Sequence, residues 1–420
     1  MTSTLLSLKK EVRFKAIQVI KSTLKGEDLQ AALDNTLSQL LDTRDKALLT
    51  ELSYGYFRYK NQLEFIWQRF IKKSAHLPLE INILLSTAVY QLLYLSKIPA
   101  YAVISWSVEF SKQNYGEKLA GLVNAVLRKI SQLSLEEDFF KQDKADTLTF
   151  LSRKYAAPTW LVRYLLKDLG EEKALKFLAS SLSRPLSSVL LAKNCDLSAL
   201  REAIEENTEV GFSIKKGREE EVFRFLEAKK CLFYNQSIES QKILLSLLEE
   251  KDHLVWDACA GSGGKSFILS RVNKKVIASD INWKRLCFLK KESKRLGFTL
   301  MGVLRASAYA LPCAQVEGIL LDVPCSGLGV IARRPDIKWK RKEEDILNLA
   351  KIQKKILSKV ASRVKKGGKI YYLTCTLTRK ENELQIAEFL TAYPQFSLEK
   401  QILPDCSRQE VFFGACLHRK

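Results

Sequence analysis

From about residue 236 onward, short apolar runs rich in β-forming residues alternate with amphipathic helical segments. The runs are LVWDACAG, VIASD, TLMGVLRAS, GILLDVP and KIYYLTCT, and the clearest helical patterns cover 283–296, 343–364 and 379–391. This alternation is typical of βαβ units, which build a mostly parallel sheet covered by helices. We therefore predict an α/β domain over 236–420. A bound cofactor is expected at the carboxyl ends of its strands.

The chain before this domain has a different pattern. Residues 1 to about 140 have apolar residues at helical spacing, for example at Ala32, Leu33, Leu37, Leu40 and Leu41, and few Gly or Pro. This predicts an all-α domain over 1–140, followed by a polar connection at 134–146. From about 150 to 235, helical segments at 160–169 and 172–182 give way to the strand-like runs SSVLLA and VFRF. We expect a small α+β module over 150–235.

The charge balance favours a polyanionic partner. Lys and Arg total 68 against 47 Asp and Glu, a formal net charge of +21 over 420 residues. Nucleic acid fits better than a membrane, because no apolar stretch reaches the roughly 20 residues needed to span a bilayer. The first residues also lack the apolar core of a signal peptide. We expect no membrane association.

The nine cysteines are odd in number and form no CxxC pair. This argues against a disulfide framework and a zinc ribbon, and favours reduced thiols in a cytoplasm. No bound metal is expected. The three histidines, His76, His253 and His418, lie apart from other candidate ligands. Histidine, the commonest general base, is therefore not expected in the chemistry.

A glycine-containing turn, Asp257-Ala-Cys-Ala-Gly-Ser-Gly-Gly-Lys265, follows an apolar strand and opens a helix. Glycines let a backbone turn tightly and approach a ligand. The turn is not a Walker A loop, which would need glycine at Cys259. The alternative to a ligand-binding turn is a simple connection between strand and helix. The next strand ends at Asp280, where a carboxylate suits a ribose diol or else caps a helix. Together they favour an adenosine-containing cofactor, without distinguishing NAD from S-adenosylmethionine.

Two cysteines follow apolar strands, Cys325 after GILLDVP and Cys375 after KIYYLT. Both should lie at the cofactor end of nearby strands, although a buried structural role is the commoner fate of a cysteine. Methylation of carbon 5 of a cytosine is one reaction that would need such a cysteine, because carbon 5 takes a methyl group only after a thiolate has added to carbon 6. The thiol therefore needs activation by donors or positive charge. Asp322 can form hydrogen bonds with the N3 and N4 edge of the base, and Lys265 could supply positive charge near the ring.

Three segments resemble the RNA 5-methylcytosine methyltransferases, above all the 16S ribosomal RNA enzymes of the Sun/Fmu (RsmB) type: GILLDVPCSGLGVIARRPDIKW, GGKIYYLTCT and DACAGSGGK. Two N-terminal segments, RDKALLTELSYGYFRYKNQLEFI and GLVNAVLRKI, resemble the NusB-like RNA-binding domain of that subgroup. YAAPTWLVRYLLKDLGEEKAL resembles its connecting module, and EVFFGACLHRK its C-terminal strand. Nearly the whole chain is covered.

This resemblance implies a Rossmann-like S-adenosylmethionine methyltransferase domain that modifies carbon 5 of a cytosine in 16S rRNA. It implies that Cys375 is the nucleophile and that Cys325 assists product release, an assignment that chemistry alone leaves open. The implied enzyme is cytoplasmic, and we expect a monomer. The implied cofactor contacts are Cys259, Ala260, Gly261, Ser262, Gly263, Gly264, Lys265, Asp280, Ser307 and Asp322.

The sequence departs from the family pattern at three places. Gly261-Ser262 replace an Ala-Pro pair, which makes the loop less rigid. Ser307 stands where an Asp usually contacts the adenine side, and Ser237 where an Asp is common. A hydroxyl can still form a hydrogen bond but offers no charged acceptor. We expect weaker cofactor binding and unchanged chemistry.

Two groups of basic residues are candidates for RNA contacts. One lies on the helix at 284–295, where a solvated surface is an equal alternative. The other spans 333–342, follows the Cys325 motif and contains Trp339, so we predict phosphate contacts there. Two other functions remain open: the same chemistry on tRNA, and a non-catalytic RNA-binding assembly factor.

Overall fold

The computed structural model describes residues 11–72, 76–136, 139–141, 146–248, 254–272, 274–309 and 315–420. Part of the connection predicted at 134–146 lies outside these ranges. The chain forms two compact units. Unit 1 comprises residues up to Leu182 together with Arg334–Lys342, and unit 2 comprises Ser183–Arg333 and Glu343–Lys420. The predicted division into three domains at 140 and 235 stays a prediction.

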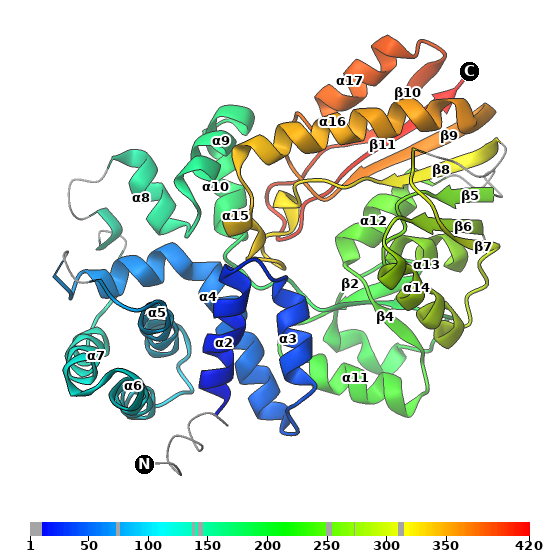
Figure 1. The fold of residues 1–420 in the computed structure, drawn as a ribbon. Helices are drawn as coiled ribbons and strands as arrows, with labels where there is room; N and C mark the ends of the chain where they lie inside the picture. The colour runs from blue at the N-terminus through cyan, green and yellow to red at the C-terminus, as the bar shows by residue number, and fades with distance from the viewer. Residues whose placement is uncertain are drawn as a thin grey trace. The chain divides into compact units, whose positions relative to one another are not determined.

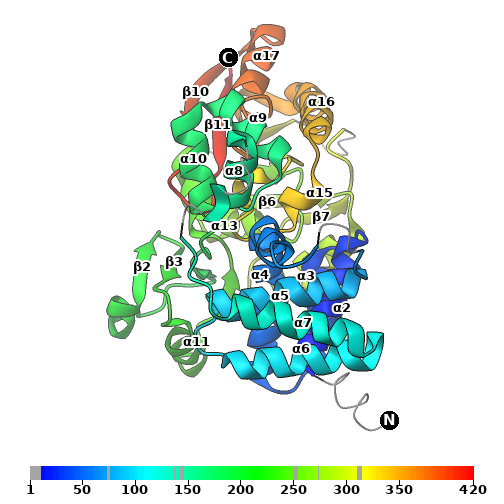
Figure 2. The ribbon, with the colours of Figure 1, turned by 90° about the vertical axis from the view of Figure 1, so that its left-hand side faces the viewer.

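Unit 1 is built from helices, as the pattern of its first 140 residues predicts. Figure 2 shows α5, α6 and α7 packed beside one another. The helices are α2 (Val12–Leu24), α3 (Leu29–Leu37), α4 (Thr43–Gln68), α5 (Leu79–Tyr94), α6 (Ala100–Tyr115), α7 (Glu117–Ile130), α8 (Thr147–Lys154), α9 (Thr159–Leu169), α10 (Glu171–Ser180) and the short α15 (Ile337–Lys340).

The long helix α4 organises this unit. The Asp42 side chain caps its first turn by accepting hydrogen bonds from the backbone N–H groups of Arg44 and Asp45, at 2.6 and 3.1 Å. At Gly55 the helix lies so close to α5 that a Cβ atom would overlap the Tyr90 ring. Glycine therefore permits close packing of α4 and α5.

Residues 334–342 follow the Cys325 loop in sequence but pack within unit 1. The Trp339 indole N–H donates to the Phe57 carbonyl oxygen at 2.6 Å, and Lys338 Nζ donates to the Arg58 carbonyl oxygen at 2.8 Å. Lys338 is 1% exposed. The predicted phosphate contact is therefore wrong for Lys338, which is buried in a protein core. Contact prediction from charge alone cannot distinguish a buried lysine from an exposed one.

Burial of Lys338 makes the stability of the protein depend on pH. Burial first, and the Arg58 charge second, lower the pKa of Lys338 to about 7. The unfolded chain, with a lysine pKa of ~10.4, binds more protons between these values, so the free energy of unfolding should rise as pH increases from about 7 to 10. We expect Lys338→Met to remove this rise and to be the more stable protein at pH 6.

Chemical denaturation of the wild type and of Lys338→Met at pH 6 and pH 9 gives the difference in their free energies of unfolding at each pH. The other titrating groups are common to both proteins, so their contribution cancels in this difference. Lys366→Met, the same change at an exposed position in the other unit, is the control. Its free energy of unfolding should differ from that of the wild type by the same amount at both pH values. An unchanged stability difference between pH 6 and pH 9 for Lys338→Met would contradict the lowered pKa.

Unit 2 contains a four-stranded antiparallel sheet in the order β2-β3-β1-β4. Its strands are β1 (Ser188–Leu191), β2 (Ile204–Asn207), β3 (Gly211–Ile214) and β4 (Phe233–Asn235). The strand predicted for SSVLLA is confirmed as β1. The strand predicted for VFRF is wrong, because these residues lie in helix α11 (Glu219–Ala228). Three acidic residues in its first turn favour a helix, and Val222 and Leu226, one turn apart, are both buried.

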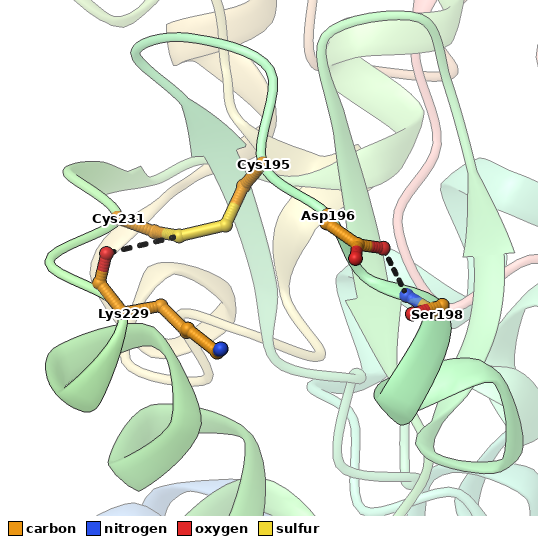
Figure 3. Close-up of a disulfide and its surroundings, with 5 residues drawn as sticks. All are labelled: Cys195, Asp196, Ser198, Lys229 and Cys231. Atoms are coloured by element: carbon orange, nitrogen blue, oxygen red, sulfur yellow. Dashed lines mark hydrogen bonds between the residues drawn. A yellow bond between two sulfur atoms is a disulfide. The ribbon is translucent and has the colours of Figure 1, made fainter.

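A disulfide joins Cys195 and Cys231 beside this sheet (Figure 3). Cys195 follows β1 and Cys231 precedes β4, and these two strands pair with Leu191 opposite Phe233. The pairing brings the two Cα atoms to 6.3 Å, within the normal range for a disulfide. The expectation of reduced thiols is therefore wrong for this pair, which a separation of 36 residues concealed in the sequence.

The main sheet of unit 2 has seven strands in the order β10-β11-β9-β8-β5-β6-β7. Neighbours from β9 to β7 are parallel, whereas β10 and β11 pair antiparallel at one edge. The strands are β5 (Leu254–Asp257), β6 (Lys275–Asp280), β7 (Gly302–Arg305), β8 (Val316–Asp322), β9 (Val364–Thr374), β10 (Phe396–Ile402) and β11 (Phe413–Arg419). The predicted α/β class and its mostly parallel sheet are confirmed.

Helices cover both faces of this sheet (Figure 1). Leu320 and Tyr371 pack in the core beneath α12 (Ile238–Leu247), α13 (Gly264–Arg271) and α14 (Trp283–Leu296). Their neighbours Leu321 and Tyr372 pack on the opposite face against α16 (Glu343–Val360) and α17 (Glu383–Ala392). Burial on both faces explains why these strands are continuous apolar runs. Within the described ranges, no helix is long and apolar enough to cross a membrane.

Candidate active site at the carboxyl ends of the strands

The glycine turn lies between β5 and α13. Gly263 has a φ of 98°, and a Cβ there would lie 2.7 Å from Phe267 Cζ. A Cβ at Gly264 would overlap the Gln236 side chain. The turn is bonded to the next strand, because the Gly261 N–H donates to the Asp280 carboxylate at 2.9 Å. Packing therefore requires glycine at Gly263 and Gly264, whereas at Gly261 no atom lies within 4 Å of the place where a Cβ would be, which leaves the turn open there.

Asp280 lies at the end of β6, as predicted, and does not cap α14. Asn282 fills that position by accepting a hydrogen bond from the Arg285 N–H at 3.2 Å. Asp280 instead accepts from the backbone N–H groups of Gly261 and Asn282. Its carboxylate therefore lies beside the glycine turn.

Asp257, at the end of β5, is completely buried. The Ser266 hydroxyl donates to its Oδ2 at 2.6 Å, whereas Oδ1 accepts no hydrogen bond of normal geometry from the described residues. Burial raises the pKa of Asp257 to about 7. A free acceptor beside an open glycine turn fits a cofactor with polar groups, such as S-adenosylmethionine. Asp257 was not predicted as a site residue, although its place at a strand end was a signal.

The Cys259 thiol lies among the carboxylates of this site. Burial first, and then the charges of Asp257, Asp322 and Asp280, raise its pKa, so it remains protonated. Ser307 follows β7, and its hydroxyl accepts a hydrogen bond from the Tyr309 N–H at 3.2 Å. In the described part of the chain, no hydrogen bond links Ser307 to the glycine turn or to Asp280.

Cys325 and Cys375 lie in loops that follow the neighbouring parallel strands β8 and β9, as predicted. Their sulfur atoms are 3.3 Å apart. The hydrogen bond between them, followed by burial and the nearby negative charges, raises the pKa of Cys325 well above its usual value. Cys325 therefore keeps its proton.

Lys265, in the first turn of α13, forms an ion pair with Asp322 at the end of β8, with Nζ 2.6 Å from Oδ2. Burial would lower the pKa of Lys265, but the Asp322 carboxylate outweighs it and raises the pKa. The negative charge of a Cys375 thiolate acts in the same direction, which places Lys265 near this sulfur. Four predicted site residues thus meet here: Cys325, Cys375, Lys265 and Asp322.

The basic helix α14 exposes most of its charged side chains. Lys284, Lys290, Lys291 and Lys294 are all exposed, and so are the aromatic rings of Trp283 and Phe288. Elsewhere, the described residues contain no group of three or more His, Cys, Asp or Glu that could hold a metal ion.

The sequence was also compared with known proteins. Residues 243–418 match the family described as 16S rRNA methyltransferase RsmB/F, and residues 10–132 match the NusB family. A Bacillus subtilis protein named "Probable ribosomal RNA small subunit methyltransferase B" is 33% identical, over 90% of this chain and 88% of its own length. The ribosomal RNA small subunit methyltransferase B of Vibrio cholerae is 30% identical over 94% of both chains.

Among solved structures, the fold is similar to the one titled "Crystal Structure of PH0851". The TM-score is 0.75, with 21% identity, over 97% of this chain and 98% of that one. This likeness extends the shared fold to nearly the full length of the chain.

Proposed function

Because this chain belongs to the 16S ribosomal RNA methyltransferase RsmB/F family, we propose that it transfers a methyl group from S-adenosylmethionine to carbon 5 of a cytosine in 16S rRNA. The observation that carries the proposal is the pair of sulfur atoms 3.3 Å apart, beside the Lys265–Asp322 ion pair. S-adenosylmethionine, when bound, supplies an electrophilic methyl group. The residues around the glycine turn and Asp280 would hold it.

The nucleophile is Cys375. Two thiols in contact lose their first proton as a pair. Because the pKa of Cys325 is raised, Cys325 keeps its proton, and in this proposal Cys375 is the sulfur that reacts as the thiolate. The nearby Lys265 ammonium stabilises this charge. The Cys375 thiolate then adds to carbon 6 of the cytosine, which makes carbon 5 nucleophilic enough to accept the methyl group.

Asp322 and Cys325 complete the reaction. The Asp322 carboxylate accepts hydrogen bonds from the cytosine amino group and from N3–H, whose proton is taken from water as the thiolate adds and is returned to water when the product leaves; these bonds stabilise the added ring. Loss of the carbon 5 proton to water then returns an electron pair to the ring, and the bond between carbon 6 and Cys375 breaks. The Cys325 thiol, in contact with this sulfur, donates a hydrogen bond to the departing thiolate.

The RNA partner is proposed from the NusB match and the charge. A net charge of +21 suits a phosphate backbone, and the target base must leave its stack to reach the half-buried cysteines Cys325 and Cys375. A cytoplasmic location and a monomeric state stay predictions.

Bisulfite sequencing of ribosomal RNA tests the proposed substrate. Deleting the gene should remove one 5-methylcytosine from 16S rRNA, and restoring the intact protein should return it. An unchanged ribosomal map with a lost position in tRNA would move the same chemistry to tRNA. If no RNA loses a 5-methylcytosine, the protein is instead a non-catalytic assembly factor.

A further inference from the structure

A buried polar cluster lies behind the two cysteine loops, between the end of β9 and the start of α17. Glu381 and Asn382 are both 0% exposed. The Glu381 carboxylate accepts four hydrogen bonds, all from uncharged donors on three residues: Ser326, Gln353 and Thr378. Burying a carboxylate is costly unless its oxygens are well bonded, so this arrangement is a built feature of the site.

Glu381 holds both neighbours of Cys325. Its Oε1 accepts from the Ser326 N–H at 2.7 Å, and its Oε2 from the Ser326 hydroxyl at 2.6 Å. The Gln353 amide donates at 3.0 Å both to Glu381 and to the Pro324 carbonyl oxygen. The residues on either side of Cys325 are therefore bonded, directly or through one side chain, to a single carboxylate.

The same cluster holds both neighbours of Cys375. The Ser326 hydroxyl lies 2.8 Å from the Thr376 hydroxyl. Asn382 accepts from the Thr374 hydroxyl at 2.6 Å and donates to the Thr376 carbonyl oxygen at 3.0 Å. The two cysteine loops thus share one continuous hydrogen-bond network.

We propose that Glu381 is a positioning residue that sets the placement of the Cys325 sulfur against the Cys375 sulfur. The inference rests on the proposed function, in which Cys325 must touch the departing Cys375 sulfur. Hydrogen bonds to a charged acceptor are short and strong, and a fully bonded buried network is rigid. Glu381 bonds to residues beside the sulfurs and forms no hydrogen bond with either.

The charge of Glu381 also acts on Cys325. After the Cys375 hydrogen bond and burial, the nearby charges of Cys375, Glu381 and Asp322 raise the pKa of the Cys325 thiol. Glu381 therefore favours the protonated form of Cys325, the form that can donate to a leaving thiolate. Removing this charge should lower the pKa of Cys325 and make it react faster with an alkylating reagent.

Glu381→Gln tests the proposal, because it removes the charge and replaces one accepting oxygen by an amide nitrogen that can only donate. We expect kcat to fall by about 10- to 100-fold, with unchanged cofactor affinity and unchanged KM for RNA. We also expect a denaturant-resistant RNA–protein adduct to accumulate, as with Cys325→Ala, and iodoacetamide to label Cys325 faster at pH 8. Glu388→Gln, a matched change at a partly exposed residue of α17, should do none of this.

Ser326→Ala is a second test that leaves the charge in place. It removes the hydroxyl between Glu381 and Thr376, and a smaller fall in kcat with some adduct accumulation is expected. If Glu381→Gln does not fold, this variant decides. Normal turnover without adduct in the variants would overturn the positioning role. If Cys325→Ala also gives no adduct, the proposed role of Cys325 fails instead, which distinguishes the two failures.

Discussion

Replacing Cys375 by alanine should abolish methyl transfer, a loss of at least about 10³-fold in kcat, and should leave no covalent complex with RNA. Replacing Cys325 by alanine should have the opposite effect on the complex, which will accumulate. In the proposed mechanism Cys375 forms the bond to carbon 6, and Cys325, whose sulfur lies 3.3 Å away, stabilises the sulfur that leaves. Gel mobility after denaturation measures the complex directly.

Cys287→Ala is the control for both cysteine variants, since Cys287 is an exposed free cysteine on α14. It should retain normal turnover and form no lasting complex. If Cys375→Ala were the variant that accumulated the complex, the two roles would be exchanged and the reaction class would stay the same.

Asp322→Asn should lower kcat by about 10²- to 10³-fold while the fold persists. Two effects combine. The amide lacks the negative charge that stabilises the protonated cytosine ring, and Lys265 loses the ion partner that lies 2.6 Å away. Without that carboxylate, burial is left to lower the pKa of Lys265, which weakens the positive charge near Cys375.

Steady-state kinetics with circular dichroism tests the Asp322 variant. The control is Asp345→Asn, the same chemical change in the first turn of α16, which should leave kcat unaltered. A normal kcat for Asp322→Asn would show that this carboxylate takes no part in the chemistry.

The sequence predicted the parts of the site that follow from strand ends. Cys325 and Cys375 were expected on nearby strands, and β8 and β9 are parallel neighbours. Asp280 was expected beside the glycine turn, and a hydrogen bond joins them. These predictions succeeded because parallel strands all end at one edge of the sheet, so local position in the sequence determines position in the site.

Features that depend on distant packing were missed. Lys338 looked like a phosphate contact, but it is buried against the backbone of α4, which is 280 residues away in sequence. Glu381 was not singled out in the sequence, where it follows Arg379 and Lys380, yet it is fully buried behind the two cysteine loops. The Cys195–Cys231 disulfide depends on strand pairing. No local pattern reports such long-range contacts.

In the proposed reaction Cys375 bonds to the cytosine ring during methyl transfer to 16S rRNA. Its most direct test is mass spectrometry of the protein after incubation with S-adenosylmethionine and 16S rRNA containing 5-fluorocytosine, whose fluorine cannot leave as a proton does. We expect a methylated fluorocytosine nucleotide attached to the Cys375 peptide. The same nucleotide on the Cys325 peptide, or methylation of normal RNA with no attachment to either cysteine, would contradict it.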